Sequence, residues 1–400
     1  KWEYPADPPS DDDYEDLLVT QIKTETLGMR YGTDNGEIKI AANVLYDADF
    51  LPHWNEFAEA LQEYQHAIRC LPADTSSSFS VWNVELPPAV LDLLSNALES
   101  THFKVLNLQD TSFGHKMASN SDVIQFSLNY MQNNPKLEVL QLTRNLFESI
   151  EDVNKLSSII KEHPSIHTIQ LTACCGDEVN DYNMLCSIMT AGTSRLKTID
   201  LSNGRISTGG STFVPDFLKS NPILEFLALW KNNFVDEDAN LIAKALKHNT
   251  NLKCLDLDNN DLTDVGWEML LKAEFDPTSL NSAADSNHTC HILSQFEFNA
   301  DQNSKIYRCY HSGAVRQKKI YSLLSLRNRQ CSNVQYFDDI PVELLPDMLS
   351  SIQQYSEYHC GEDAPEQDDK DTNVLSIVFE VMRRWDGSFS VYEAANNCSA

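Results

Sequence analysis

The sequence lacks several features that catalysis or membrane insertion requires. It has no run of 18 apolar residues, so no segment is suited to span a bilayer. Glycine is scarce, with 13 residues in a chain of 400, and no glycine-rich phosphate-binding loop is present. The hydrolase motif GxSxG and the zinc-protease motif HExxH are also missing. We therefore expect a protein that is not an enzyme and has no cofactor, no small-molecule substrate and no membrane contact.

Basic residues are also few. The chain has 30 Lys and Arg against 59 Asp and Glu, which gives a formal net charge of −29. An acidic surface repels phosphate backbones, so we do not expect nucleic acid as a partner. Such a charge keeps a protein soluble, and it equally suits a partner with a basic segment.

The ten cysteines are scattered and form no CxxC pair. This pattern favours reduced thiols in the cytoplasm or nucleus. A cluster of His and Cys over residues 288–311 lacks the tight paired spacing of structural zinc sites, so no metal is expected. The sequon at Asn287 is a short pattern that arises often by chance. The chain begins with Lys1, as expected of a trimmed or mature form. Whether a targeting segment preceded Lys1 is left open.

What the sequence does contain is a leucine pattern, L-x-x-L-x-L-x-x-N/C-x-L. Residues 137–147, 224–234 and 252–262 match it fully when Phe is accepted at the last position. Residues 103–113, 166–176 and 196–206 keep the pattern with Thr111, Cys174 and Gly204 at the ninth position, and residues 76–86 and 280–290 are weaker copies. The eight units begin 27 to 34 residues apart, at 76, 103, 137, 166, 196, 224, 252 and 280.

Each unit predicts one strand and one helix. Leucines at positions 4 and 6 alternate as in a strand and point inward, so positions 5 and 7 face outward. Asn or Cys at position 9 can satisfy the backbone where the chain leaves the strand. Apolar residues then recur at helical spacing over 152–162 and 236–247, and prolines at 135, 164 and 222 end the helices. Because one unit cannot bury its apolar face alone, the units are expected to stack.

This repeat resembles the ribonuclease-inhibitor-like class of leucine-rich-repeat proteins over roughly residues 35–290. The resemblance implies an α/β fold, a curved solenoid or horseshoe with parallel strands on the concave face and helices on the convex face. It also implies that the concave face binds protein partners. The C-terminal part is similar to a family of uncharacterised microalgal leucine-rich-repeat proteins, through KIYSLLSLRN at 319–328, IPVELLPDML at 340–349 and VMRRWD at 381–386. That second resemblance implies no activity.

Four regions follow from these patterns. Residues 1–34 are predicted to be an acidic mobile arm and lead-in, and residues 35–75 an N-terminal cap with Trp54, Phe57, Leu61 and Tyr64 at helical spacing. The solenoid is predicted over 76–290, and a mostly helical extension with an acidic loop at 361–371 follows over 291–400. The basic stretch 305–329 either docks on the protein's own acidic body or offers a patch to an acidic partner or an anionic surface.

The outward strand positions supply the candidate binding residues. Two large aromatics stand on a mostly polar face, and such residues often anchor binding, although each can instead pack on a neighbour. The acidic residues near the second tryptophan suit a basic partner segment, or are merely solvated. The candidate partner-binding residues are Trp82, Asn107, Gln109, Arg144, Asp200, Trp230, Lys231, Asp256 and Asp258.

The expected function is therefore a protein-interaction module or scaffold that binds a partner protein on its concave face. Two alternatives stay open. The segment at 340–349 is slightly similar to the opening of an F-box, which would make the protein a ubiquitin-ligase substrate adaptor. Ran-type GTPase-activating proteins share the repeat class and an acidic tail, which would make it a regulator of a small GTPase.

Overall fold

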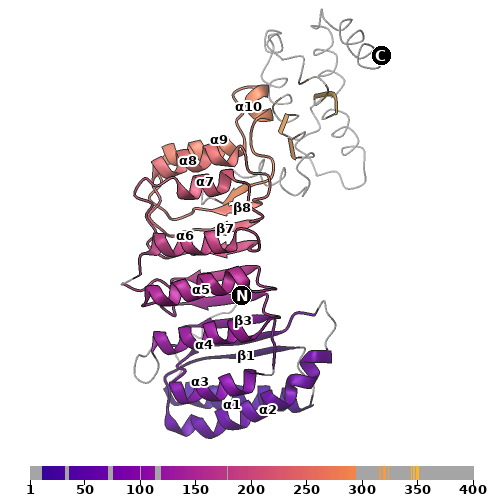
Figure 1. Ribbon diagram of the computed structural model, residues 1–400, viewed down its shortest axis with the longest axis vertical. Helices are drawn as coiled ribbons and strands as arrows, with labels where there is room; N and C mark the ends of the chain where they lie inside the picture. Colours follow the sequence, from indigo (N-terminus) through magenta and orange to yellow (C-terminus); the bar gives the residue numbers. More distant parts are fainter. Residues whose placement is uncertain are drawn as a thin grey trace, which may run out of the picture.

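Nine parallel strands form one continuous sheet, and the helices that connect them lie on one of its faces (Figure 1). This computed structural model describes residues 11–31, 36–70, 75–99, 101–112, 119–177 and 179–293, with positions 315, 316, 319, 320, 323, 344, 346 and 348–350. The strands lie side by side in chain order, from β1 to β9, so each pairs with the strand of the preceding unit. The predicted alternation of strands and helices in an α/β array is therefore confirmed.

The elements have the following bounds. The strands are β1 (Glu37–Val44), β2 (Ser78–Val84), β3 (Val105–Gln109), β4 (Val139–Thr143), β5 (Thr168–Thr172), β6 (Thr198–Asp200), β7 (Phe226–Ala228), β8 (Cys254–Asp256) and β9 (His291–Leu293). The helices are α1 (Asp11–Tyr31), α2 (Leu51–Cys70), α3 (Pro88–Leu98), α4 (Asn120–Asn133), α5 (Ile150–Glu162), α6 (Asp181–Gly192), α7 (Phe213–Lys219), α8 (Asp236–Leu246), α9 (Asp264–Glu274) and α10 (Leu280–Ala284). A short 3-10 helix, η1 (Ala48–Phe50), precedes α2.

Leucines in equivalent strand positions line up across the sheet and form its core. Ile199, Leu227 and Leu255 are register partners in β6, β7 and β8. Two residues later Leu201, Leu229 and Leu257 are each at most 1% exposed. Their strands stay paired there, because Leu201 N donates to Ala228 O at 3.0 Å and Leu229 N donates to Asp256 O at 2.8 Å. The expected alignment of these three leucines in adjacent parallel strands is confirmed.

Asparagine at the ninth position of a unit joins that unit to the preceding one. The amide nitrogen of Asn145 donates to Leu108 O at 3.0 Å, and its oxygen accepts from the backbone N–H of Thr111 at 3.1 Å. Cys174 takes the same place in its unit, where its Sγ donates to Leu142 O at 3.2 Å. These side chains satisfy backbone groups where the chain turns out of each strand, as the sequence predicts.

The N-terminal end differs from the prediction of a mobile arm over residues 1–34. Residues 11–31 form helix α1, which packs on α2 and β1. Leu18, Ile22 and Met29 are at most 5% exposed and lie on one side of this helix. The acidic composition of the segment concealed this apolar spacing, which is sufficient to dock a helix on the first strand. Residues 1–10 lie outside the described residues.

The cap predicted over residues 35–75 has the expected core. Trp54, Phe57, Leu61 and Tyr64 of α2 are all buried. Phe57 packs on Phe79 of β2 with ring centroids 6.4 Å apart, which links the cap to the first full unit.

The prediction of a weak repeat unit at residues 280–290 is wrong. Residues 280–284 form helix α10, and the last strand, β9, begins at His291 and pairs with β8. Leu280, Ala283 and Ala284 are buried at helical spacing, so the inserted helix moves the strand past the end of the 280–290 unit. Most of the extension predicted over 291–400, its acidic loop 361–371 included, lies outside the described residues.

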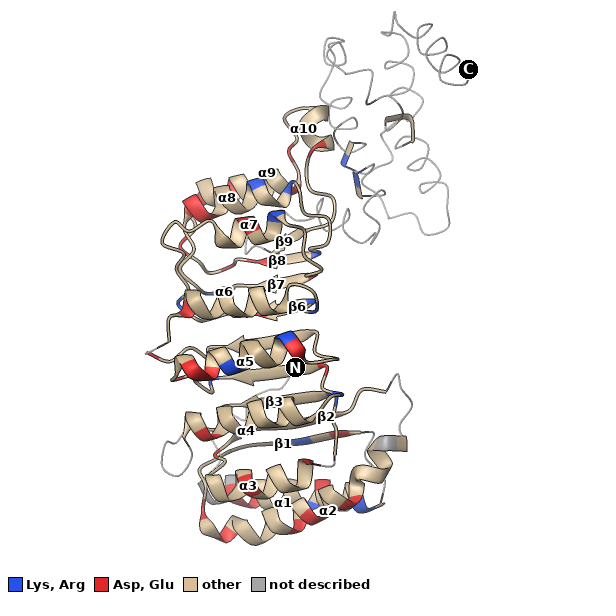
Figure 2. Ribbon diagram, in the orientation of Figure 1, with Lys and Arg blue, Asp and Glu red and all other residues tan. Residues whose placement is uncertain are grey.

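Acidic and basic residues are concentrated at opposite ends of the helices. First turns hold acidic residues in α4, α5, α6, α8 and α9, and last turns hold a lysine in α5, α7, α8 and α9 (Figure 2). This arrangement complements the helix dipoles and makes the edge with the helix N-termini the more acidic one.

No helix within the described residues combines the length and apolar character that a membrane span requires.

Candidate functional site

The face of the sheet that the helices leave uncovered carries outward side chains in rows, and we call it the open face. The row at the start of the strands contains Ser78, Val105, Val139, Thr168, Thr198, Phe226, Cys254 and His291, of which Phe226 is 44% exposed. Two further rows carry the candidate residues. One row, the amide row, contains Ser80, Asn107, Gln141, Gln170, Asp200, Ala228 and Asp256, which are successive register partners. The other, the tryptophan row, lies two residues further along each strand and contains Trp82, Gln109, Thr143, Thr172, Ser202, Trp230 and Asp258. Most of these side chains are half-buried, and Ser80 and Ser202 are buried.

Trp230 lies beside an acidic group at the C-terminal end of the open face. Its neighbour in the tryptophan row is Asp258, and Asp200 and Asp256 flank Ala228 in the amide row. Burial raises the pKa of Asp256, and the nearby carboxylates of Asp258 and Asp200 raise it further. Lys231 Nζ lies 5.7 Å from the centroid of the Trp230 ring, at the rim of this group. The structure therefore brings together five of the candidate residues, all at one end of the face.

Trp82 lies at the other end of the open face and is paired with a cation. Nζ of Lys39, an exposed residue of β1, lies 3.5 Å from the centroid of the Trp82 ring. The indole Nε1 is buried and has no hydrogen-bond partner among the described residues. Sequence reasoning missed Lys39, although Ile38 and Ile40 point inward and their alternation places Lys39 on the outward side.

Uncharged polar side chains occupy the middle of the open face. Asn107 and Gln109 of β3 are half-buried there. The side-chain amide of Gln141 donates to the side-chain oxygen of Gln170 on the next strand. A ladder of amides and hydroxyls presents both donors and acceptors, so it can hydrogen-bond to the backbone of another chain.

Arg144 and Lys231 do not belong to either row, because the eighth position of each unit turns the chain off the strand. The residues at this position in seven units all have φ between +50° and +57°. Arg144 is exposed, and its Nη1 lies 2.6 Å from Oδ2 of Asp110, the eighth residue of the preceding unit. The candidate residues predicted from sequence include Arg144 and Lys231 from position 8 of the repeat, as if that position faced outward like positions 5 and 7. The left-handed turn instead places the side chains of position 8 at the rim of the face.

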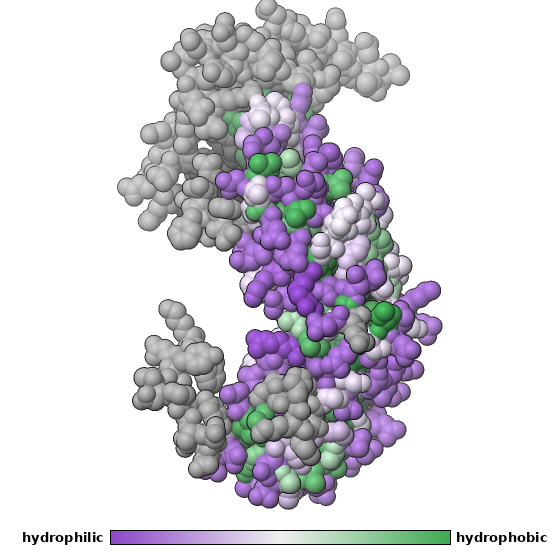
Figure 3. All heavy atoms as spheres, turned by 90° about the vertical axis from the view of Figure 1, so that its left-hand side faces the viewer, coloured by the Kyte–Doolittle hydropathy of each residue, from purple (hydrophilic) through white to green (hydrophobic). Residues whose placement is uncertain are grey.

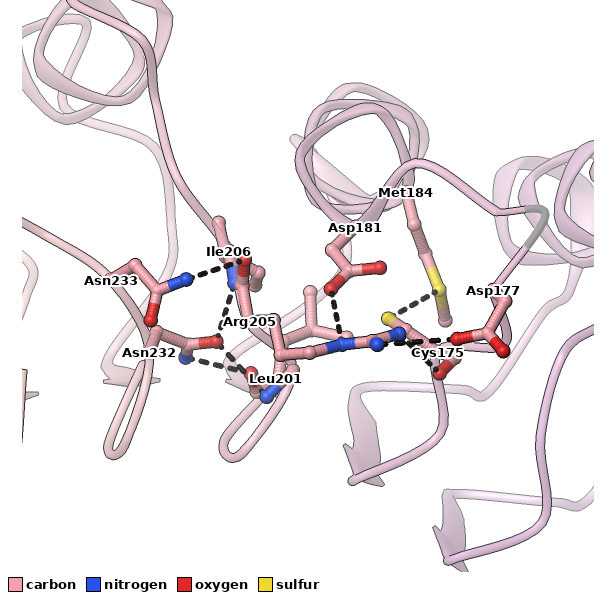
Figure 4. Close-up of polar contacts among 10 residues, drawn as sticks. Cys175, Asp177, Asp181, Met184, Leu201, Arg205, Ile206, Asn232 and Asn233 are labelled. Carbon is pink, nitrogen blue, oxygen red and sulfur yellow. Dashed lines mark hydrogen bonds and ion pairs between the residues drawn. The ribbon is translucent and has the colours of Figure 1, made fainter.

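A shallow hollow lies at a different place, on the edge where the strands end and the helices begin. It is lined by Asp177, Val179, Asn180, Asp181, Tyr182, Arg205 and Ser207. The Arg205 guanidinium spans it, with Nη1 3.2 Å from Asp177 Oδ1 and Nε 3.7 Å from Asp181 Oδ2 (Figure 4). Figure 3 looks at this edge, where hydrophilic residues predominate. Arg205 forms ion pairs with both acids across two successive units, so the hollow is a contact between units.

The basic stretch 305–329 contributes two described residues to the end of the array. Lys319 is buried, and its Nζ donates to Glu274 O and to Asn287 O, the latter at 2.6 Å. Arg316 Nε donates to Ala284 O at 3.4 Å. For these two residues the structure agrees with docking on the protein's own body; the other bases of the stretch lie outside the described residues. Most of the F-box-like segment 340–349 lies outside them too.

Asn287 is not available for glycosylation in this fold. Asn287 is 4% exposed and its Nδ2 donates to Leu246 O and Asn249 O at 2.6 and 2.7 Å.

The cysteines that the structure describes are free thiols; they are Cys70, Cys174, Cys175, Cys186, Cys254 and Cys290. In the same part of the chain no group of three or more His, Cys, Asp or Glu side chains is placed to hold a metal ion.

No protein-family model matches the sequence, and no curated protein sequence is significantly similar to it.

Proposed function

We propose that this protein is a leucine-rich-repeat solenoid of the ribonuclease-inhibitor-like type and a non-enzymatic scaffold that binds a partner protein on its open face. The repeat is supported by the leucines at positions 4 and 6 and the asparagines at position 9, which recur in register from unit to unit. The curvature expected of such a solenoid is supported by the bowed outline of the described residues in Figure 3. The open face is then the concave side.

One observation carries the functional proposal. Trp82 and Trp230 are both half-buried on a mostly polar sheet face that also carries the exposed Phe226, and no helix covers them in the part of the chain that is described. Tryptophans in such positions are over-represented among residues that dominate binding energies. The polar residues between them, Asn107 and Gln109 among them, can add hydrogen bonds without apolar exposure.

The test compares partner capture by four versions of the full chain: wild type, Trp82→Ala, Trp230→Ala and Tyr31→Ala. Tyr31 is an aromatic of helix α1, away from the open face, and 77% exposed, so its variant is the matched control. Proteins captured from native extract are quantified by mass spectrometry, and circular dichroism checks each fold. A partner retained by wild type and Tyr31→Ala but lost with either tryptophan supports the proposal. Capture that is identical for all four proteins contradicts it.

The two alternative functions stay hypotheses. A ubiquitin-ligase adaptor should co-purify with a ligase scaffold, and deletion of residues 337–355 should abolish that association. A GTPase regulator should change the turnover of a small GTPase in a direct assay. No described residue is placed in a way that favours either of these functions over the scaffold. The proposal also keeps the expected location of the scaffold, which is the cytoplasm or nucleus.

A further inference from the structure

The two tryptophans of the open face lie in a single row at a defined separation. Trp82 is on β2 and Trp230 lies two residues beyond the end of β7, so five strand-to-strand steps separate them. At about 4.8 Å per step the two side chains are roughly 24 Å apart along the sheet. The row residues between them are Gln109, Thr143, Thr172 and Ser202, none of which is charged. The row between the two tryptophans is thus an uncharged polar strip with an aromatic at each end.

The two ends of this strip have opposite charge. Lys39 lies over the Trp82 ring at one end. At the other end Asp258 is the neighbour of Trp230 in its row, Asp200 and Asp256 flank Ala228 in the adjacent row, and Lys231 at the rim is exposed. Within the described residues Asp200 and Asp256 form no ion pair with Lys or Arg; they accept hydrogen bonds from the backbone N–H groups of Ser202 and Asp258, at 2.9 and 3.0 Å.

Carboxylates that lie close together and are partly removed from water repel one another. Asp256 is half-buried and its pKa is raised, chiefly by burial; a hydrogen bond from the backbone N–H of Asp258 opposes this, and the carboxylates of Asp258 and Asp200 add to it. A cation placed among the three carboxylates relieves this repulsion, whereas an anion there adds to it. The Lys39–Trp82 pair has the reverse preference, because its charge is exposed and positive.

This inference rests on the proposed function. We infer that the partner enters the open face with one elongated polypeptide segment aligned along the tryptophan row, with its cationic end on Asp200, Asp256 and Asp258 and its anionic end on Lys39 and Trp82. The charge complementarity of the two ends fixes the direction of the segment. The amides of Gln141 and Gln170 lie alongside and are available for hydrogen bonds from its backbone or side chains.

The separation of the tryptophans also sets the length of the segment. A span of roughly 24 Å corresponds to about 16 residues of α-helix or about seven residues of extended chain. The dipole of a helix would reinforce the same direction, because its positive N-terminal end would lie on the three carboxylates.

The experiment selects peptides directly on the full chain. A displayed library of random 16-residue peptides is enriched on the wild type and depleted on the Trp82→Ala/Trp230→Ala double variant. We expect survivors with Lys or Arg near one end and Asp, Glu or a free carboxylate near the other. For synthetic survivors, Asp256→Asn and Lys39→Gln should each weaken binding about tenfold, whereas the matched surface variants Glu237→Gln and Asp264→Asn on the helix side should leave it unchanged.

A charge-inverted chain provides the decisive comparison. In the triple variant Lys39→Glu/Asp256→Lys/Asp258→Lys, a survivor synthesised in reversed residue order should bind better than the original peptide. Survivors without charge polarity, or an unchanged preference in the inverted chain, overturn the inference. If no peptide depends on the tryptophans but native capture still does, the partner docks by a folded surface, and the inference fails while the proposed function stands.

Discussion

Asp236, the first residue of α8, occupies the space that a side chain on Gly266 of α9 would need. A Cβ built on Gly266 would lie 2.3 Å from Asp236 Oδ1. The Asp236 carboxylate is held there because it accepts hydrogen bonds from the backbone N–H and the hydroxyl of Thr263, at 2.8 and 2.5 Å. The hydroxyl bond is the main cause of the lowered pKa of Asp236. Two consecutive units are thus joined at the first turns of their helices.

This contact reverses the usual effect of replacing a helical glycine. In an ordinary exposed helix Gly→Ala stabilises by about 1 kcal/mol. In α9 we expect Gly266→Ala to lower the free energy of unfolding by about 1 kcal/mol, because an overpacked contact costs roughly 1–3 kcal/mol. Urea denaturation measures the change. In an Asp236→Ala background the same substitution should become neutral or stabilising, and a stabilising effect in the wild type would show that the carboxylate is not held as described.

Two adjacent asparagines provide a matched test of the ninth repeat position. Asn232 is 4% exposed; its Nδ2 donates to Leu201 O and Leu229 O, and its Oδ1 accepts from Gly204 N and Ile206 N, all within 3.1 Å (Figure 4). Its neighbour Asn233 is exposed, and its side chain donates a single hydrogen bond within the described residues, to Arg205 O at 3.3 Å.

Replacing Asn232 by Ala leaves several backbone groups buried without partners. Each such group costs roughly 1–3 kcal/mol, so we expect Asn232→Ala to lower the free energy of unfolding by about 3 kcal/mol. Asn233→Ala should change it by less than about 0.5 kcal/mol. Chemical denaturation of both variants gives the comparison, and equal effects would refute the special role of the ninth position.

The repeat could be predicted from sequence because each unit solves the same packing problem with the same residue types. Leu229 and Asn232 recur at fixed spacing, and their burial follows from strand alternation and from the backbone groups at the turn. The left-handed eighth position could not be predicted, because residues as different as Arg144 and Ala173 occupy it. The backbone remains paired to the next unit at this position, because Arg144 N donates to Thr172 O at 3.0 Å.

The ends of the array were predicted less well for a related reason. Repeat arguments apply where both neighbours are alike, and an end has only one neighbour. Acidic composition obscured the apolar side of α1, and the inserted helix α10 displaced β9 from the frame. For the candidate site, the frame found Trp82 and Trp230, whereas the Lys39 contact across two strands needed the structure.

The first strand of the sheet is protected by a side chain that imitates a neighbouring strand. Gln21 of α1 donates from Nε2 to Ala41 O and accepts at Oε1 from Ala41 N, both at 2.7 Å. We expect Gln21→Leu to expose the Ala41 amide to hydrogen exchange and to lower stability by about 1–2 kcal/mol. Gln62→Leu, the same change at an exposed position of α2, is the control.

Hydrogen exchange followed by mass spectrometry or NMR reads the Ala41 amide directly. The amides of β2 should stay protected in Gln21→Leu, because their partners are other strands. Exchange at Ala41 that is as slow in the variant as in the wild type would mean that the helix body, not the Gln21 side chain, protects the edge.

The other end of the array has a buried lysine whose titration makes stability depend on pH. Burial lowers the pKa of Lys319 to about 8, and the nearby Glu274 and Cys290 oppose this shift. Its usual pKa in an unfolded chain is about 10.4. Because the folded state releases the proton more readily, the cost of a buried ammonium is fully present below about pH 8 and diminishes up to about pH 10.

We therefore expect the free energy of unfolding to gain up to about 3 kcal/mol from Lys319 as the pH rises from 7 to 10, since each pKa unit is worth about 1.4 kcal/mol. Lys319→Met should remove this gain and leave the contributions of other titrating groups. Urea unfolding at pH 7, 8, 9 and 10 of both proteins gives the difference between their slopes. Because tyrosines and thiols titrate in the same range in both, only that difference reports on Lys319. Parallel slopes would show that the ammonium is solvated in the folded protein, and a steeper decline of the wild type with pH would reverse the sign of the argument.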